Sequence, residues 1–261
     1  MEAEEWMKYP TDMTAAPTAP EIHIDQLTFG YDGQMLFKDF SFSITAGQWT
    51  CLLGPSGCGK STLLRMISGS LTKRVSGSIH FDGQAQRQGQ ASWMAQKDLL
   101  LPWLSVLDNV LLGPRLRRTL TRGRRQRALE LLEAVGLSDY DQALPAALSG
   151  GMRQRVALLR TLMEARPVIL MDEPFSALDA LTRLKLQNLA ADLVQGATVL
   201  LVTHDPWEAL RLGHRIHIIK GRPAQLSQAF LPPGAPPRDP EREAITPMYT
   251  ELLSQLVEKN N

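Results

Sequence analysis

The segment from Gln48 to Gly69 constrains the fold more than any other part of this sequence. It joins an apolar run, QWTCLLG, to the glycine-rich stretch GPSGCGKS and then to the helical pattern STLLRMISG. Glycines allow the backbone to curl so that successive N–H groups face one anion, and a helix N-terminus adds partial positive charge. The spacing G-x-x-x-x-G-K-S between a strand and a helix therefore predicts a phosphate-binding loop.

The side chains of this loop have separate expected roles. Lys60 would reach the β- and γ-phosphates of a nucleotide, and Ser61 would ligate Mg²⁺. Cys58 stands among the glycines, and we expect it to be a small filler that points away from phosphate. The residues expected to contact ATP in this segment are Gly54, Pro55, Ser56, Gly57, Cys58, Gly59, Lys60, Ser61 and Thr62.

Three apolar runs without alternation predict the centre of a parallel β-sheet that is buried on both faces. The runs are QWTCLLG, PVILMDEP and ATVLLVTH, and they end in a glycine loop, an Asp-Glu pair and a Thr-His-Asp turn. Ligands collect at the carboxyl ends of strands in open α/β sheets, so we expect one site along this rim. There Asp172 would hold Mg²⁺ through its water shell, and Glu173 would polarise the attacking water.

The segments around these runs predict further layers. IHIDQLTFGYDG, KDFSFSITAG and GSIHFDG alternate apolar with polar residues and favour an antiparallel edge layer. Residues 99–165 have a helical pattern throughout, with a turn near Leu144 and Pro145. The expected fold is α/β: a P-loop NTPase core with a parallel central sheet, an antiparallel edge layer and an inserted helical subdomain. Residues 1–20 form an expected flexible arm, and residues 222–261 form a proline-rich tail closed by a short helix.

A second glycine stretch, LSGGMRQRV, resembles the signature of the ABC-type ATPases. Similar elements follow in the family's order over about residues 21–221, and this span is the expected ATPase domain. They are Tyr31 as the adenine-stacking ring, with Phe29 as its rival, Gln96 as the loop glutamine, Ser176-Ala177-Leu178-Asp179 as the dimer loop, and His204 as the switch histidine. His204 is expected to meet the γ-phosphate, with a structural histidine as the alternative. The sequence departs from the usual signature at Met152, where the family has Gln, without touching the expected phosphate contacts.

The second glycine stretch precedes a helical pattern and therefore predicts another anion site. One chain cannot easily bring two such sites to one γ-phosphate from opposite sides, whereas two chains related by a two-fold axis can. The resemblance implies an ATP-sandwich homodimer in which the partner's ATP meets Ser149, Gly150, Gly151 and Asp179. It also implies the catalytic residues Lys60, Gln96, Glu173 and His204, and the Mg²⁺ ligands Ser61, Gln96 and Asp172.

The same resemblance implies the ATP-hydrolysing subunit of an importer, similar to the nitrate, sulfonate and taurine group that includes thiamine-precursor pyrimidine importers. Its partners would be two transmembrane permease subunits and, indirectly, a solute-binding protein. It would lie peripherally on the cytoplasmic face of the membrane. In QKDLLLPWLSVLDNVLLG, the leucines and Trp103 predict a groove for a permease helix, with the core of the helical subdomain as the alternative.

Composition limits the rival classes. A formal charge of +1 gives no general attraction to nucleic acid, and no sustained heptads indicate the coiled coil of DNA-repair ATPases. The guanine motif of switch GTPases is absent from the sequence, but an efflux or lipoprotein-release ATPase remains an alternative. Cys51 and Cys58 fit a reducing compartment, and the acidic N-terminus does not resemble a signal peptide. Seven arginines within residues 115–127 are interpreted as a solvated face, with lipid phosphates as the alternative.

Overall fold

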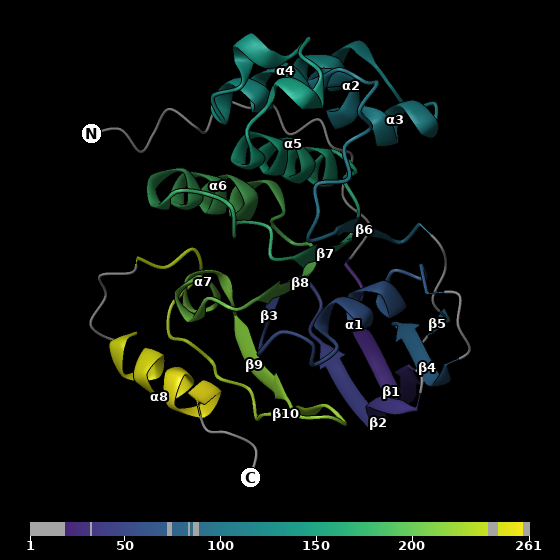
Figure 1. Cartoon of the computed structure of the whole chain (residues 1–261), viewed down its shortest axis with the longest axis vertical. Helices are drawn as coiled ribbons and strands as arrows, with labels where there is room; N and C mark the ends of the chain where they lie inside the picture. The colour runs from purple at the N-terminus through teal and green to yellow at the C-terminus, as the bar shows by residue number, and fades with distance from the viewer. Residues whose placement is uncertain are drawn as a thin grey trace.

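A parallel central sheet organises the chain, with an antiparallel sheet beside it and helices above it (Figure 1). The computed structural model describes residues 19–31, 33–71, 75–82, 84–85, 89–239 and 245–257. Most of the expected N-terminal arm, residues 1–18, lies outside these ranges.

The central sheet has six strands in the order β10-β9-β3-β8-β7-β6. All neighbouring pairs are parallel except β9 and β10. The three apolar runs predicted as buried strands are confirmed, because β3, β7 and β8 are adjacent and every residue in them is buried. The bounds are β3 Trp49–Leu53, β6 Ala91–Met94, β7 Val168–Asp172, β8 Thr198–Thr203, β9 Arg215–Lys220 and β10 Gln225–Leu226.

Alternate residues of these strands face two different cores, as a strand period of two requires. In β8, Val199 and Leu201 pack among the helices, whereas Leu200 and Val202 pack against the antiparallel sheet. Because both faces are covered, these strands read as nearly continuous apolar runs and not as an alternating pattern.

The antiparallel sheet has the order β2-β1-β4-β5, which confirms the predicted edge layer. Phe37, Phe40 and Phe42 of β2 contribute aromatic rings to the core between this sheet and the central one. The bounds are β1 Ile22–Tyr31, β2 Gln34–Ile44, β4 Ser76–Phe81 and β5 Gln84–Ala85.

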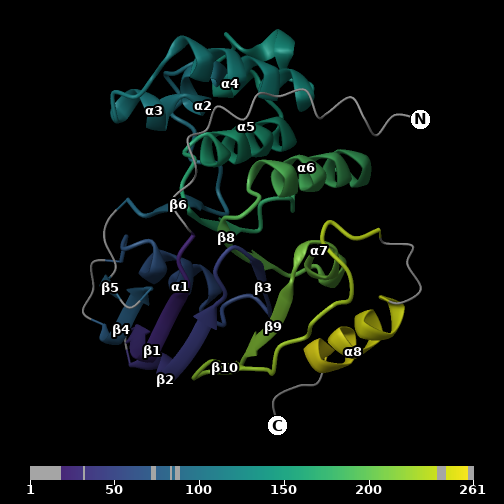
Figure 2. The same cartoon turned by 180° about the vertical axis from the view of Figure 1, so that it is seen from behind.

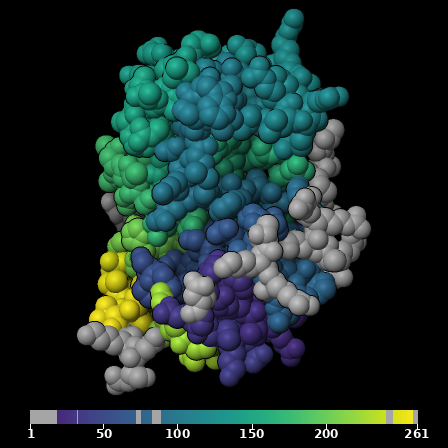
Figure 3. All heavy atoms as spheres, turned by 45° about the vertical axis from the view of Figure 1, so that its right-hand side comes forward, coloured from purple at the N-terminus to yellow at the C-terminus, as the bar shows by residue number. Residues whose placement is uncertain are grey.

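The helical subdomain forms the end of the molecule opposite the antiparallel sheet (Figure 3). Its helices are α2 Val106–Val110, α3 Leu112–Leu116, α4 Arg122–Ala134 and α5 Gly150–Leu162. The expectation of helix throughout residues 99–165 is wrong at 99–105 and 117–121, and in the segment before α5 only short 3₁₀ turns occur. Pro102 disfavours helix at the preceding residue. The buried amide of Asn109 satisfies the backbone there, accepting from Leu101 N at 2.8 Å and donating to Leu104 O at 3.1 Å.

The remaining helices frame the central sheet, and Figures 1 and 2 both place α5 and α6 between the helices α2–α4 and the strands. Helix α1 Lys60–Ile67 follows β3, α6 Ala180–Leu193 lies between β7 and β8, and α7 Pro206–Leu212 follows β8. The terminal helix α8 Thr246–Val257 packs on α7, where Tyr249 stacks on Trp207 with ring centroids 4.2 Å apart. Among the described residues, the helices are too short or too polar to cross a membrane.

Candidate functional site

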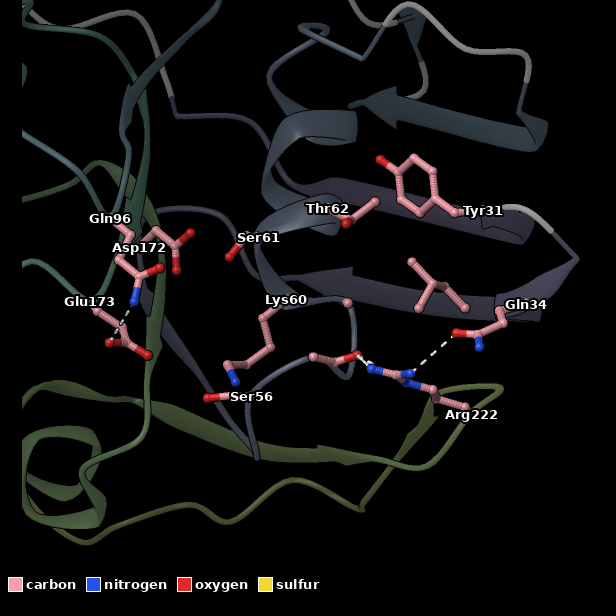
Figure 4. A pocket seen from close by; sticks show the side chains of 13 residues that line it. Tyr31, Gln34, Ser56, Lys60, Ser61, Thr62, Gln96, Asp172, Glu173 and Arg222 are labelled. Carbon is pink, nitrogen blue, oxygen red and sulfur yellow. Dashed lines mark hydrogen bonds between the residues drawn. The ribbon is translucent and has the colours of Figure 1, made fainter. Parts of the chain in front are cut away.

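A hollow of about 350 Å³ lies at the carboxyl ends of β3 and β7 (Figure 4). Its walls come from the turn after β3, the start of α1, the antiparallel sheet and the segments after β6, β7 and β9. The lining residues are Tyr31, Gln34, Leu36, Ser56, Gly57, Gly59, Lys60, Ser61, Thr62, Gln96, Asp172, Glu173 and Arg222. Ten of these thirteen were expected from the sequence, and Gln34, Leu36 and Arg222 were not.

The glycine loop is held in a conformation that larger residues could not adopt. Gly59 has φ +102°, and a Cβ there would lie 2.8 Å from the Cζ atom of Phe37. A Cβ on Gly54 would lie 2.1 Å from the carbonyl oxygen of Ile219, so the loop backbone lies flush against β2 and β9. Helix α1 starts at this loop with no side-chain cap at Gly59. Its first N–H groups are therefore oriented as in an anion site.

Lys60 and Cys58 are both buried within the loop, but only Lys60 lines the hollow. The ammonium of Lys60 is largely buried and donates to the carbonyl oxygens of Gly54 at 2.6 Å and Pro55 at 2.8 Å. The side chain of Cys58 packs into the core beside the antiparallel sheet, and burial raises the pKa of its thiol. Gly54, Pro55 and Cys58 do not line the hollow, so Cys58 takes the filler position that the sequence suggested.

Oxygen atoms suited to a divalent cation converge behind the loop. Burial of Asp172 raises the pKa of its carboxyl, while its hydrogen bond with Ser61 acts in the opposite direction. A hydroxyl and a carboxylate in contact are hard ligands of the kind Mg²⁺ prefers, and Gln96 adds an amide on the same wall. Among the described residues there is no cluster of three His, Cys, Asp or Glu side chains that could hold a metal by itself. Ser61, Asp172 and Gln96 supply fewer oxygens than the six that Mg²⁺ takes, so such an ion would also need ligands from phosphate and water.

Glu173 lies between two side chains that arrive from different strands. Gln96, after β6, donates to Oε2 of Glu173 at 3.2 Å, and Nδ1 of His204, after β8, lies 3.2 Å from Oε1. The carboxylate side chain is 14% exposed and the imidazole 63%. Glu173 also has φ +50°, a strained conformation for a residue with a side chain, and Gln154 binds its carbonyl.

A buried network supports the turn that carries His204. Thr203 donates to Oε2 of Glu208 and accepts from the backbone N–H of Asp205 at 3.1 Å. Burial is the main reason why the pKa of Glu208 rises to about 7. Asp205 caps α7 and pairs with Arg183 of α6 at 3.3 Å, and Arg183 also donates to Leu178 O at 3.0 Å.

The second glycine stretch lies apart from this hollow. Ser149 caps α5 by accepting from Met152 N at 3.3 Å, and Gly150 begins the helix. Asp179 is exposed and caps α6 by accepting from Thr182 N at 3.0 Å, a bond that lowers the pKa of its carboxyl. Ser149, Gly150, Gly151 and Asp179 are all absent from the lining of the hollow.

Of the two aromatic residues that could stack on a base, Tyr31 lines the hollow and Phe29 does not. Tyr31 lies at the end of β1 on the wall of the hollow, as Figure 4 shows. Phe29 is buried behind it in an edge-to-face contact with ring centroids 4.8 Å apart. Only Tyr31 is therefore placed to stack on a ligand.

Two residues that sequence reasoning missed are Gln154 and Arg222. Gln154 is a nearly buried polar residue on α5, and its amide bridges Glu173 O at 2.9 Å and Ala177 N at 2.9 Å. Arg222 follows β9. This strand was not predicted, because its sequence RIHIIK mixes polar with apolar residues and is not a continuous apolar run. The rule that ligands meet strand carboxyl ends, applied to that fourth parallel strand, would have found Arg222.

Comparisons with known proteins agree with this geometry. The sequence model of a family described as ABC transporter matches residues 37–176. An aliphatic sulfonates import ATP-binding protein (SsuB) of Cupriavidus necator is 41% identical over 244 residues, 90% of this chain and 77% of that protein. One of Rhodococcus jostii is 40% identical over 94% of this chain and 98% of its own length.

Solved structures lead to the same family. A dimeric ATP-binding cassette in a post-hydrolysis state, bound to ADP and Pi, superposes with TM-score 0.70 at 29% identity and covers 82% of this chain and 99% of that one. The motif order, the site geometry and these likenesses agree. The chain belongs to the ABC transporter family and is an ATP-hydrolysing, ATP-binding subunit.

Proposed function

We propose that this chain hydrolyses ATP to power an importer of aliphatic sulfonates, working at the cytoplasmic face of the membrane beneath two permease subunits. The observation that supports this most is identity of 40–41% to sulfonate-import ATP-binding proteins along nine-tenths of the chain. The solute itself contacts other subunits, so the structure of this site supports the ATP chemistry and the likeness supports the solute class.

Within the site, each side chain is assigned by its position. Lys60 and the amides of the glycine loop bind the phosphates, and Tyr31 stacks on the base from the opposite wall. Ser61, Asp172 and Gln96 would hold Mg²⁺, which neutralises phosphate charge when bound. Glu173 orients and polarises the attacking water, while His204 and Gln96 fix its carboxylate.

The second glycine stretch acts on the ATP of a partner chain. Helix N-termini attract anions, yet Ser149, Gly150 and Gly151 do not line the hollow of their own chain. A two-fold dimer lets each chain give these residues and Asp179 to the other's nucleotide. The dimeric form of the superposed cassette supports this arrangement.

The permease would dock on the helical subdomain. Trp103 is 71% and Leu99 58% exposed in the non-helical segment before α2, while Leu100 and Val106 are buried in the core. Some apolar residues of this segment therefore belong to the core of the helical subdomain. The two exposed side chains could pack against a permease helix.

Light scattering on the full chain carrying Glu173→Gln tests the ATP-driven dimer. We expect a monomer that becomes a dimer when ATP and Mg²⁺ are added, and no change when Lys60→Ala is also present. A chain that stays monomeric with a co-expressed permease would overturn the assignment of the second glycine stretch. Uptake of a labelled aliphatic sulfonate by vesicles that hold the whole importer tests the proposed solute class. Uptake of taurine or nitrate in its place would refute that solute class.

A further inference from the structure

Arg222 reaches the phosphate-binding loop from the far end of the chain. It follows β9, the parallel neighbour of β3, so the carboxyl ends of both strands meet on one rim. Gly221 has φ +84° and turns the chain back toward that rim. Arg222 lies beyond residues 37–176, the part that the family model matches, and nothing in the motif order assigns it a role.

The guanidinium of Arg222 donates two hydrogen bonds to one carbonyl group of the loop. Its Nη2 donates to the carbonyl oxygen of Gly57 at 2.7 Å and its Nε donates to the same oxygen at 3.1 Å. Its Nη1 lies 3.4 Å from Oε1 of Gln34, at the start of β2 (Figure 4). The fit is close, because a Cβ on Gly57, which has φ +81°, would lie 2.6 Å from Nη2.

We propose that Arg222 is a positioning residue that holds the phosphate-binding loop in its anion-binding conformation before nucleotide arrives. A trans peptide group is planar, so its C=O and its N–H point in opposite directions. Fixing the Gly57 carbonyl toward the guanidinium therefore directs the N–H of Cys58 away from Arg222. Successive N–H groups of a curled glycine loop must face one anion, so fixing this peptide plane fixes the direction of one of them.

The geometry requires arginine and not only a positive charge. Two nitrogens of one planar fork meet a single oxygen, while a third reaches Gln34. Lysine has a compact ammonium on a flexible stem and cannot reproduce this fork. The side chain is exposed, so a purely electrostatic contribution to ligand binding would be screened by salt. The proposal rests on the nucleotide function proposed above, but the loop conformation can be measured without any nucleotide.

The test compares Arg222→Gln and Arg222→Lys in the full chain. Arg125→Gln is the matched control, because Arg125 is an exposed arginine on α4 far along the chain from the loop. Hydrogen exchange read by mass spectrometry on the nucleotide-free protein reports the amides of residues 54–61. We expect faster exchange there in both Arg222 variants and wild-type exchange in the control.

A fluorescent ADP analogue, titrated at low and high salt, measures the consequence for binding. We expect the affinity for the ADP analogue to fall about tenfold in Arg222→Gln. Arg222→Lys should lose nearly as much affinity, and high salt should not remove the difference from wild type. Unchanged loop exchange would overturn the proposal, and so would full rescue by lysine together with loss of the effect in salt. If the wild-type chain failed to bind ADP, the nucleotide function would be refuted, while the exchange data would still decide whether Arg222 holds the loop.

Discussion

The imidazole Nδ1 of His204 lies 3.2 Å from Oε1 of Glu173, although the two residues directly follow different strands, β8 and β7. The other oxygen of the same carboxylate accepts from Gln96 at 3.2 Å. A carboxylate held from both sides has one orientation relative to the hollow. Positioned groups of this kind contribute to catalysis mainly by avoiding reorganisation during the reaction.

Replacing the carboxylate should separate binding from hydrolysis. Glu173→Gln keeps the shape of the side chain but removes the charge that we propose polarises water, so we expect ATP hydrolysis to fall at least about 100-fold. Binding of a fluorescent ATP analogue should stay within a few-fold of wild type. Phosphate release measures the first quantity, Glu133→Gln on α4 is a charge-matched control, and normal turnover in Glu173→Gln would refute the assigned role.

His204 and Glu173 should act as one unit. If the imidazole works by orienting the carboxylate, His204→Ala will lower hydrolysis, but the double variant with Glu173→Gln will be no slower than Glu173→Gln alone. Groups in contact are non-additive in this way. A double-mutant cycle of single-turnover rates tests it, and additive losses would mean that His204 acts on the substrate independently.

Gln154 should stabilise the loop between β7 and α6. Gln154→Ala leaves the N–H of Ala177 and the carbonyl of Glu173 without their buried partner. We expect the free energy of unfolding to fall by about 1–3 kcal/mol. Urea denaturation gives the value, the exposed Gln126→Ala on α4 should change it little, and equal effects of the two substitutions would contradict this role.

Glu208 should make stability depend on pH. Its pKa rises from 4.5 to about 7, chiefly through burial, with Asp205 and Glu173 adding to the rise and Thr203 and Arg183 opposing it. The folded chain therefore keeps a proton between pH 4.5 and 7 that the unfolded chain releases. Stability from this group is full below about 4.5 and falls as pH rises to about 7.

The substitution Glu208→Gln mimics the protonated side chain at every pH. At pH 8 we expect it to raise the free energy of unfolding by up to about 3 kcal/mol relative to wild type, with little difference near pH 4.5. Urea titrations at the two pH values measure this. A variant less stable than wild type at pH 8 would show that the charged form is compensated in the fold.

Arg238 should fasten the proline-rich tail. Its side chain is 2% exposed and donates to backbone carbonyls of the tail and of α7. The acceptors at the end of α7 are Leu210 O at 3.0 Å and Gly213 O at 2.7 Å. Arg238→Met leaves these carbonyls without a donor. We expect the free energy of unfolding to fall by about 3 kcal/mol and proteolysis after residue 226 to become faster. Arg166→Met, in the turn before β7, is a control, and unchanged proteolysis would refute the fastening role.

Much of the site could be inferred from the sequence because its chemistry is concentrated in local motifs. The loop around Lys60 and the pair at Asp172 directly follow buried strands, and parallel strands bring their carboxyl ends together. Gln154 and Arg222 could not be inferred in this way. Each acts through a backbone group distant in the chain, and no local pattern encodes such a contact.

The sequence by itself determined the class of fold, the order of the motifs and the glycine-rich loop that we propose binds phosphate, since apolar runs and glycine spacing are local properties. Only the tertiary structure decided that Tyr31 and not Phe29 faces the hollow, that residues 99–105 leave the helix, and that Arg222 meets the loop. These outcomes depend on which surfaces pack together and which backbone groups lose water, and packing is a property of the whole folded chain.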